Sequence, residues 1–213
     1  MNEHISMIQH LHLQPGTHAV HAHTSSLVQH GCRLLQRVGS ASAAHDTTLQ
    51  DAADREQMIS WRPRYVKDLL LILDGSGRYG TVAAEDDGHV QFFAPVTGTL
   101  PNALPEAAVL CCHLTCDVVR GRPQPVLLAY DMHTPASLAA RRPMPERYQD
   151  MLRLRDAVEG IVVGAAPVRV QWLGPAESYD KLCALELPHE RGGIVALDGE
   201  AYYEYVRGGR YGC

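Results

Sequence analysis

Short apolar stretches that alternate with turn signals fill most of the sequence from residue 67 onward, and this pattern constrains the fold more than any other feature. The stretches are rich in branched residues, and the turn residues Asp74-Gly75, Asp87-Gly88 and Gly121 separate several of them. Such a pattern is typical of a sheet built from many short strands. It predicts strands over 67–73, 79–84, 89–93, 108–114, 117–119, 126–130, 168–173, 193–197 and 201–206.

Helical patterns flank these strands. Residues 24–38 begin with a Thr/Ser cap and place apolar side chains at helical spacing, and residues 144–160 form an amphipathic pattern that stops at a glycine. Weaker patterns predict helices over 45–59 and 175–185. No internal repeat or dividing linker is present, so we predict a single α+β domain over 1–213, with mostly antiparallel sheets, flanking helices and a His-rich N-terminal segment over 1–23.

The charge of the chain restricts its partners. The net charge is −5, so no overall positive field is available to hold long nucleic acid, and any RNA contact must be local. No apolar run reaches about 18 residues, and the first residues lack the charged-then-apolar plan of a signal peptide. We therefore expect a soluble intracellular protein, nuclear or cytoplasmic, without a membrane partner.

Six cysteines and 12 histidines are candidate metal ligands. A chain of this length does not need disulfides to stabilise its core, so we expect reduced thiols. Cys112, Cys116 and His113 could bind zinc, but no second pair of ligands completes such a site. Two His-x-His pairs within residues 10–23 could bind a metal, and a polar N-terminal segment explains them as well. We predict no metal site.

Lysine is scarce, and the basic residues cluster at one place. Lys67 and Lys181 are the only lysines, which leaves 17 arginines among the 19 basic residues (19 − 2). A mechanism that needs several lysines is therefore excluded. Arg62, Arg64 and Lys67 stand directly before a predicted core strand, in ISWRPRYVKDLLLIL at 59–73. A basic group at this place requires either a solvated edge or a site that contacts phosphate.

The order of several segments resembles the nucleotidyltransferase domain of eukaryotic mRNA capping enzymes (mRNA guanylyltransferases), within the covalent nucleotidyltransferase superfamily that includes the ligases. ISWRPRYVKDLLLILDG is similar to the family's nucleophile motif and following strand, "VSWKADGTRYxxLIDG". The resemblance covers roughly residues 13–210. It is also carried by LQPGTHAV, TSSLVQHGCRLL, PVLLAYDM, RRPMPERYQDMLRLRDAVEG and VRVQWLGPAESYDKLCALELPHERGGIVAL, the last similar to the segment ending "HExDGLIF".

The position that carries the chemistry departs from the family. The lysine of the family's KxDG motif attacks the α-phosphate of GTP and forms a lysyl-N–GMP phosphoramidate, which requires an amine that can be neutral. The matching residue is Arg62, whose guanidinium stays protonated and is a very poor nucleophile. The motif's Asp and Gly fall on Arg64 and Tyr65. The resemblance therefore implies an inactive domain.

Other motif positions have also changed. The acid of the family's LDGE motif corresponds to Asp117, and the DG of "HExDGLIF" becomes Gly192-Gly193, while His189 and Glu190 remain. The family's later lysine pair and its C-terminal OB-fold have no counterpart in these 213 residues. A metal-assisted GTP reaction would thus lack its nucleophile, an acid and its phosphate-binding lysines.

The resemblance also supplies candidate ligand-binding residues. Arg62, Arg64 and Lys67 could clamp a nucleotide or an RNA 5′ end without chemistry, or they could form a basic edge that pairs with acids such as Asp68. A base could stack on Tyr130. The nucleotide- or phosphate-binding candidates are Arg62, Arg64, Lys67, Asp117, Tyr130 and Glu190.

Several aromatic residues have more than one interpretation. Trp61 is predicted to lie in the core, and Trp172 in the core or at a sheet edge. Phe92 is a second candidate for base stacking. The tyrosine-rich strand that contains Tyr202, Tyr203 and Tyr205 suits a partner surface as well as a ligand site.

Three functional hypotheses follow. The first is an inactive mRNA guanylyltransferase-like domain that binds a guanine nucleotide with Mg²⁺, an RNA 5′ end or cap, or a protein partner. The second is a structural or assembly subunit whose cleft is filled by its own side chains. The third, an active mRNA guanylyltransferase with a rearranged site, is disfavoured by the scarcity of lysine.

Overall fold

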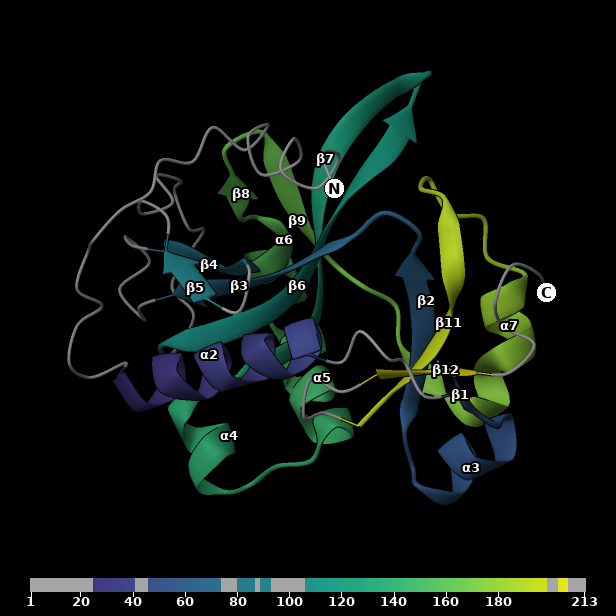
Figure 1. Ribbon diagram of the computed structural model, residues 1–213, viewed down its shortest axis with the longest axis horizontal. Helices are drawn as coiled ribbons and strands as arrows, with labels where there is room; N and C mark the ends of the chain where they lie inside the picture. Colours follow the sequence, from purple (N-terminus) through teal and green to yellow (C-terminus); the bar gives the residue numbers. More distant parts are fainter. Residues whose placement is uncertain are drawn as a thin grey trace.

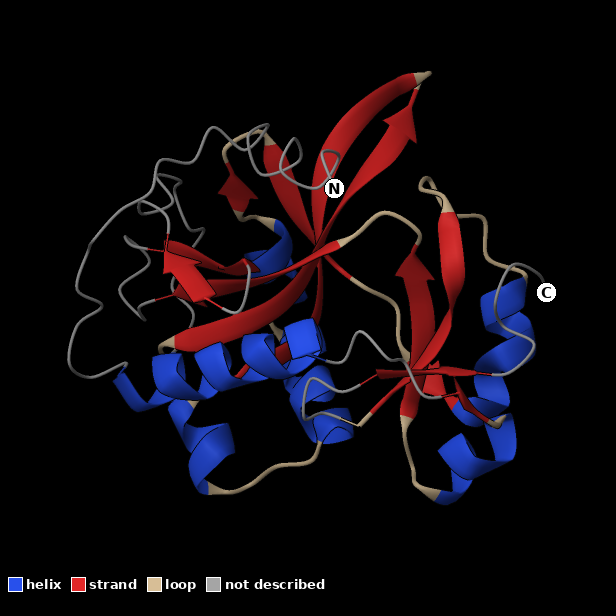
Figure 2. Cartoon of the chain, viewed as in Figure 1, coloured by secondary structure: helices blue, strands red, loops and turns tan. Residues whose placement is uncertain are grey.

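The chain forms two mixed β-sheets with helices packed around them (Figures 1 and 2). The computed structural model describes residues 25–40, 46–73, 80–86, 89–92, 106–198 and 203–206. Two of the described strand pairs, β1 with β12 and β7 with β9, are parallel, and the other pairs are antiparallel. The predicted α+β class is confirmed.

The larger sheet has seven strands in the order β5-β4-β3-β6-β7-β9-β8. Its central strands, β3 and β6, carry apolar side chains that are almost fully buried, such as Leu70 and Leu110. The predicted strand over 67–73 is confirmed to the residue. The strands are β3 (Lys67–Leu73), β4 (Gly80–Asp86), β5 (His89–Phe92), β6 (Ala108–Val119), β7 (Arg122–His133), β8 (Val162–Val163) and β9 (Ala166–Val170).

The hairpin of β6 and β7 is longer than the sequence pattern predicts. The predicted strands 108–114 and 117–119 form one strand, because Thr115 and Cys116 continue the pairing with β7. β3 pairs with β6 only as far as Leu114, so the end of the hairpin projects beyond the sheet (Figure 1). The backbone N–H of Val118, on this projecting part, donates to the carbonyl of Pro188 at 2.7 Å. This bond holds the segment after residue 183 against β6.

The smaller sheet has five strands in the order β1-β12-β11-β2-β10. Trp61 and Ile59 on β2 pack with Ile194 on β11 and Leu182 on α7 (Tyr179–Cys183) in a separate small core. The strands are β1 (Asp46–Thr47), β2 (Met58–Pro63), β10 (Gly174–Pro175), β11 (Arg191–Leu197) and β12 (Tyr203–Val206).

The prediction of one helix over 45–59 is wrong. Only Leu49–Asp54 (α3) is helical, after Thr48 and Asp51 form a reciprocal capping box. The chain leaves the helix through Glu56, whose φ is 53°, and then enters β2. The apolar residues of this region therefore serve a strand that pairs with β11, and tertiary pairing overrides the weak helical pattern.

The other helices pack mainly on the larger sheet. Helix α2 lies against β3 to β6, and α5 lies against β7. The predicted helix over 144–160 is divided at Leu154, whose backbone leaves the helical region. No helix in the described part of the chain is long and apolar enough to cross a membrane. The remaining helices are α2 (Ser25–Ser40), α4 (Pro135–Ala139), α5 (Met144–Arg153), α6 (Arg155–Glu159) and the 3-10 turn η2 (Ala176–Ser178).

The cysteines agree only in part with the prediction of reduced thiols. Cys32, Cys111, Cys112 and Cys116 are free. Cys183 is disulfide-bonded, so the prediction is wrong at this position. Chain length indicates whether a disulfide is needed for stability, and it does not indicate whether two thiols lie close enough to form one.

Candidate functional site at the junction of the sheets

The two sheets meet where β2 leads into β3 and where the segment after β9 returns to β10 (Figure 1). Side chains alternate along β2, so Ile59 and Trp61 face the small core, while Met58 belongs to the large core. Arg62 has the same parity as Met58 and therefore points into the junction. Its side chain is only 7% exposed.

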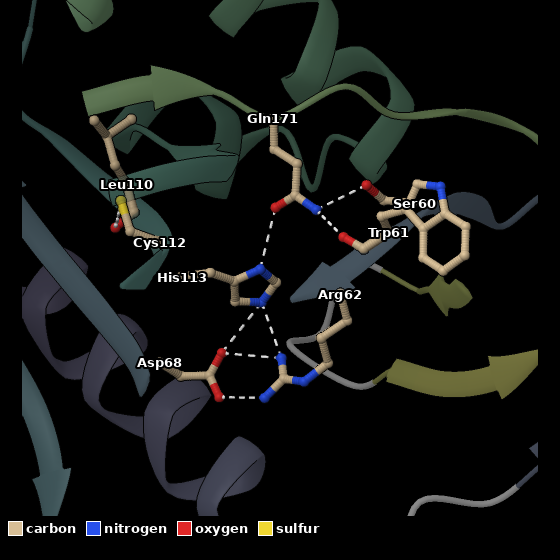
Figure 3. A network of polar contacts seen from close by, with 8 residues as sticks. All are labelled: Ser60, Trp61, Arg62, Asp68, Leu110, Cys112, His113 and Gln171. Atoms are coloured by element: carbon tan, nitrogen blue, oxygen red, sulfur yellow. Dashed lines mark hydrogen bonds and ion pairs between the residues drawn. The ribbon is translucent and has the colours of Figure 1, made fainter. Parts of the chain in front are cut away.

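Arg62 makes a two-pronged ion pair with Asp68 on β3. Its Nη2 donates to Oδ2 of Asp68 at 2.9 Å, and its Nη1 approaches Oδ1 at 3.3 Å (Figure 3). This fork geometry is the one that arginine forms best with a carboxylate. The same Nη1 lies 3.0 Å from Nε2 of His113 on β6. Because a guanidinium only donates, Nε2 of His113 accepts this hydrogen bond. The same Nε2 also lies 3.2 Å from Oδ1 of Asp68.

His113 extends the cluster toward the other sheet. With Nε2 acting as an acceptor, the imidazole proton resides on Nδ1, which donates to Oε1 of Gln171 at 3.1 Å. The Gln171 amide nitrogen donates to Oγ of Ser60 at 2.8 Å and to the carbonyl of Trp61. Oγ of Ser60 in turn donates to the carbonyl of Trp172 at 2.7 Å. We call Arg62, Asp68, His113, Gln171 and Ser60 the junction network.

The protonation states in the junction network are set by burial and by neighbouring charge. Burial opposes ionisation of Asp68, but the Arg62 guanidinium and the nearby His113 outweigh it and hold the pKa of this carboxyl well below its ordinary value. Burial lowers the pKa of His113 more than its contacts with Asp68 raise it. The network is thus a buried ion pair beside a neutral histidine, and its hydrogen-bonding groups satisfy one another.

A second Arg–Asp–His cluster lies further along β6. Asp117, which is 2% exposed, accepts from Nη1 of Arg169 at 2.9 Å and from Nδ1 of His189 at 3.0 Å. The Arg169 side chain is 49% exposed, whereas that of His189 is 7% exposed. These three residues line a pocket of about 170 Å³ beside β2. We call them the pocket cluster.

A third cluster of the same composition fixes helix α5 to the larger sheet. Nη2 of Arg147 on α5 donates to Asp131 on β7 at 2.6 Å, and His133 lies 3.2 Å from the same carboxylate. Burial opposes ionisation of Asp131, but the nearby His133 and Arg147 overcome it and lower the pKa of this carboxyl to about 2. All three side chains are at most 8% exposed, so this cluster serves packing.

The structure distributes the candidate clamp residues among different environments. Arg62 is buried against Asp68, as in the basic-edge alternative. Arg64, half exposed, forms an ion pair with Glu190 at the surface. Lys67 begins β3 beside Leu114 and is partly exposed.

The candidate stacking residues also differ in their accessibility. Tyr130 is 5% exposed, and its ring lies 4.4 Å from the ring of His113, so His113 covers a face on which a base would stack. Trp61 is buried as predicted, and its Nε1 donates to the carbonyl of Leu182 at 2.6 Å. Trp172 is 40% exposed. The side chain of Phe92 and the whole of Tyr202 lie outside what the structure describes.

Three residues of the junction network and the pocket cluster are not predicted from the sequence: Ser60, Gln171 and Arg169. Asp68 is predicted only as an acid of the basic-edge alternative, and His113 only as a zinc candidate. A stronger signal exists for these last two. Asp68 and His113 interrupt apolar runs that form central strands, and a polar side chain there requires a partner. Gln171 and Arg169 occupy a stretch with mixed polarity, which carries no such signal.

No protein-family model matches the chain, and comparison with curated proteins finds no similar sequence. Within the described ranges, no three histidine, cysteine, aspartate or glutamate side chains gather in a way that could hold a metal ion. The His-x-His pairs of residues 10–23 lie outside those ranges.

Proposed function

We propose that the chain is a non-catalytic, mRNA guanylyltransferase-like domain whose cleft is closed by its own side chains, and that it acts as a structural or assembly subunit that binds a protein partner. The observation that carries this proposal is the junction network. The residue that stands for the family's nucleophilic lysine, Arg62, is committed to a buried ion pair with Asp68.

The energy of this pair argues against a phosphate-binding role for Arg62. To contact a phosphate, the Arg62 guanidinium would have to leave Asp68. The Asp68 carboxylate, which is only 15% exposed, would then lose its ion-pair partner. Breaking one side of a buried ion pair costs about 3–5 kcal/mol. Arg62 also cannot act as a nucleophile, because a guanidinium stays protonated at any working pH.

The neighbouring positions support a closed cleft. The ring of His113 occupies one face of Tyr130. On β11, a Cβ at Gly192 would lie 2.8 Å from the backbone of Arg64 and Pro63, so an acid in the place of Gly192 would not fit. The altered motif positions Arg62 and Gly192 therefore agree with each other. At both positions the side chain or backbone packs against the protein itself and leaves no room for a ligand.

Labelling with GTP tests this proposal. The wild type and Arg62→Lys are incubated with α-labelled GTP and Mg²⁺ or Mn²⁺, and protein-bound label is measured after denaturation. We expect no label on either protein, because the lysine of the variant would pair with Asp68 and remain charged. Label on the wild type would contradict the non-catalytic assignment, and label on the variant alone would contradict the closed cleft.

A second candidate function is binding of a guanine nucleotide or an RNA 5′ end at the rim of the junction. The ion pair of Arg64 and Glu190 favours it, since both side chains are about half exposed (50% and 52%). An exposed ion pair of this kind stabilises the folded protein by only about 0–1 kcal/mol. Replacing Glu190 by a phosphate as the partner of Arg64 therefore costs little. Thermal denaturation with GTP, GMP and cap analogues separates the candidates. Saturable stabilisation that disappears in Arg64→Ala supports rim binding, and no shift at millimolar ligand supports the assembly subunit.

A further inference from the structure

The pocket that Asp117, Arg169 and His189 help to line has about the volume of one six-membered aromatic ring. It lies between β2, the segment that joins β9 to β10, and the segment that follows α7. Its volume is about 170 Å³. A cavity of about 150 Å³ with apolar walls holds one benzene molecule. The walls here include the apolar side chains Trp61, Leu128, Val170, Trp172, Leu182 and Leu187.

One wall of the pocket includes the partly exposed side chain of Trp172. Trp172 is 40% exposed, although it is large and apolar. A Cβ at position 174 would lie 2.5 Å from the Trp172 ring, so the ring rests against the backbone at Gly174. A planar ring in the pocket would therefore meet a fixed aromatic wall, an arrangement that favours stacking.

The polar end of the pocket offers one acceptor and several donors. A carboxylate only accepts, so Nδ1 of His189 donates to Asp117, and in the neutral imidazole Nε2 is an acceptor. Nε2 has no hydrogen-bond partner among the described residues. Arg169 uses one N–H group on Asp117 and keeps others at the half-exposed rim. The charges of Asp117 and Arg169 cancel, so this end suits a neutral group that both donates and accepts.

The other polar groups in the wall do not compete for a ligand. Ser60 and Gln171 line the pocket, but both belong to the junction network, where their hydrogen bonds are used. The polar end is therefore the pocket cluster alone. A hydroxyl on an aromatic ring matches it, because the O–H can donate to Nε2 of His189 while the oxygen accepts from Arg169.

We propose that this pocket binds a phenolic ring, with the ring between the apolar walls and the hydroxyl at His189 and Arg169. The ligand is either a small phenol or the tyrosine side chain of a partner protein. The site shares Ser60 and Gln171 in its wall with the junction network, but the proposal does not depend on the proposed function.

NMR titration with simple probes tests the proposal. The two tryptophans, Trp61 and Trp172, both line the pocket, so their indole N–H signals report directly on its occupancy. The ¹⁵N-labelled full chain is titrated at pH 8 with 4-methylphenol, with 4-methylanisole, which cannot donate, and with toluene. N-acetyltyrosinamide and a tyrosine-containing peptide distinguish a free phenol from a partner side chain.

We expect 4-methylphenol to shift the indole signals saturably and to bind roughly five- to tenfold more tightly than 4-methylanisole or toluene, the factor that one hydrogen bond supplies. Val170→Phe fills the pocket at a partly exposed position and should abolish the shifts. His189→Leu should remove the preference for the phenol while ring binding remains. The proposal is overturned by equal affinities for phenol and anisole in the wild type, by shifts that persist in Val170→Phe, or by no saturable shift up to the solubility limit.

Discussion

The junction network and the pocket cluster contain the same three residue types in opposite settings. In the junction network, Arg62 is 7% exposed and donates to both Asp68 and His113, so every member is used internally. In the pocket cluster, Arg169 is 49% exposed and its histidine turns Nδ1 toward Asp117, which leaves Nε2 open. The residue types therefore do not decide whether such a cluster uses its hydrogen-bonding groups internally. The two clusters differ in the exposure of the arginine and in the orientation of the imidazole.

The largest expected difference between the two clusters is in stability. Arg62→Ala leaves the buried Asp68 carboxylate without its ion-pair partner. This change should lower the free energy of unfolding by about 3–5 kcal/mol. Arg169→Ala removes a half-exposed partner, and Asp117 keeps its bond to His189, so a loss of at most about 1 kcal/mol is expected. Urea denaturation of both variants measures the contrast. Equal losses of unfolding free energy in Arg62→Ala and Arg169→Ala would contradict the distinction between the junction network and the pocket cluster.

Acid sensitivity extends the comparison to the third cluster, which is closed like the junction network. The pKa of Asp131 is about 2 in the folded chain and about 3.9 in an unfolded chain. A carboxyl with a depressed pKa contributes stability above its unfolded pKa and loses it as the pH falls through its folded pKa. Between about pH 5 and pH 2, the wild type should therefore lose about 2–3 kcal/mol more than Asp131→Asn. Equal pH slopes in denaturant melts would contradict the closed arrangement around Asp131.

Coupling between partners sharpens the comparison further. Each single variant, R62M or D68L, leaves the other residue of the pair buried and charged without a partner. The double variant R62M/D68L replaces both with apolar residues of similar size and so removes both charges. The double variant should be more stable than the less stable single variant, with a coupling energy of about 1–3 kcal/mol. Additive losses in a double-mutant cycle would show that the two side chains do not act as a buried pair.

The smallest effect is expected two residues along the chain from the buried arginine. Arg64→Ala removes the exposed ion pair with Glu190 and should change the free energy of unfolding by about 0–1 kcal/mol, with the effect reduced further by salt. Denaturation at low and high ionic strength measures it. A loss as large as that of Arg62→Ala would mean that Arg64 is not a surface residue.

The sequence predicts the long strands of the larger sheet because their apolar runs are bounded by turn residues, and it does not predict β1, β2, β8 or β10. The strand over 67–73 and the buried position of Trp61 are confirmed. The helix over 45–59 fails because pairing between β2 and β11 is a contact over more than 100 positions, which a local pattern does not contain. The same reason explains why the partners of Arg62 could be named only in part. Asp68 is a near neighbour in the sequence, whereas His113 and Gln171 come from other strands and segments.

The central claim is that the junction is closed by its own hydrogen bonds, and the Nδ1 proton of His113 tests it most directly. In this arrangement the proton is buried and bonded to Gln171, so its imidazole signal in a ¹⁵N-edited spectrum should be observable, slow to exchange with water and unchanged by millimolar GTP. A rapidly exchanging proton, or a signal that GTP shifts or removes, would show that the cleft is open and would contradict the account.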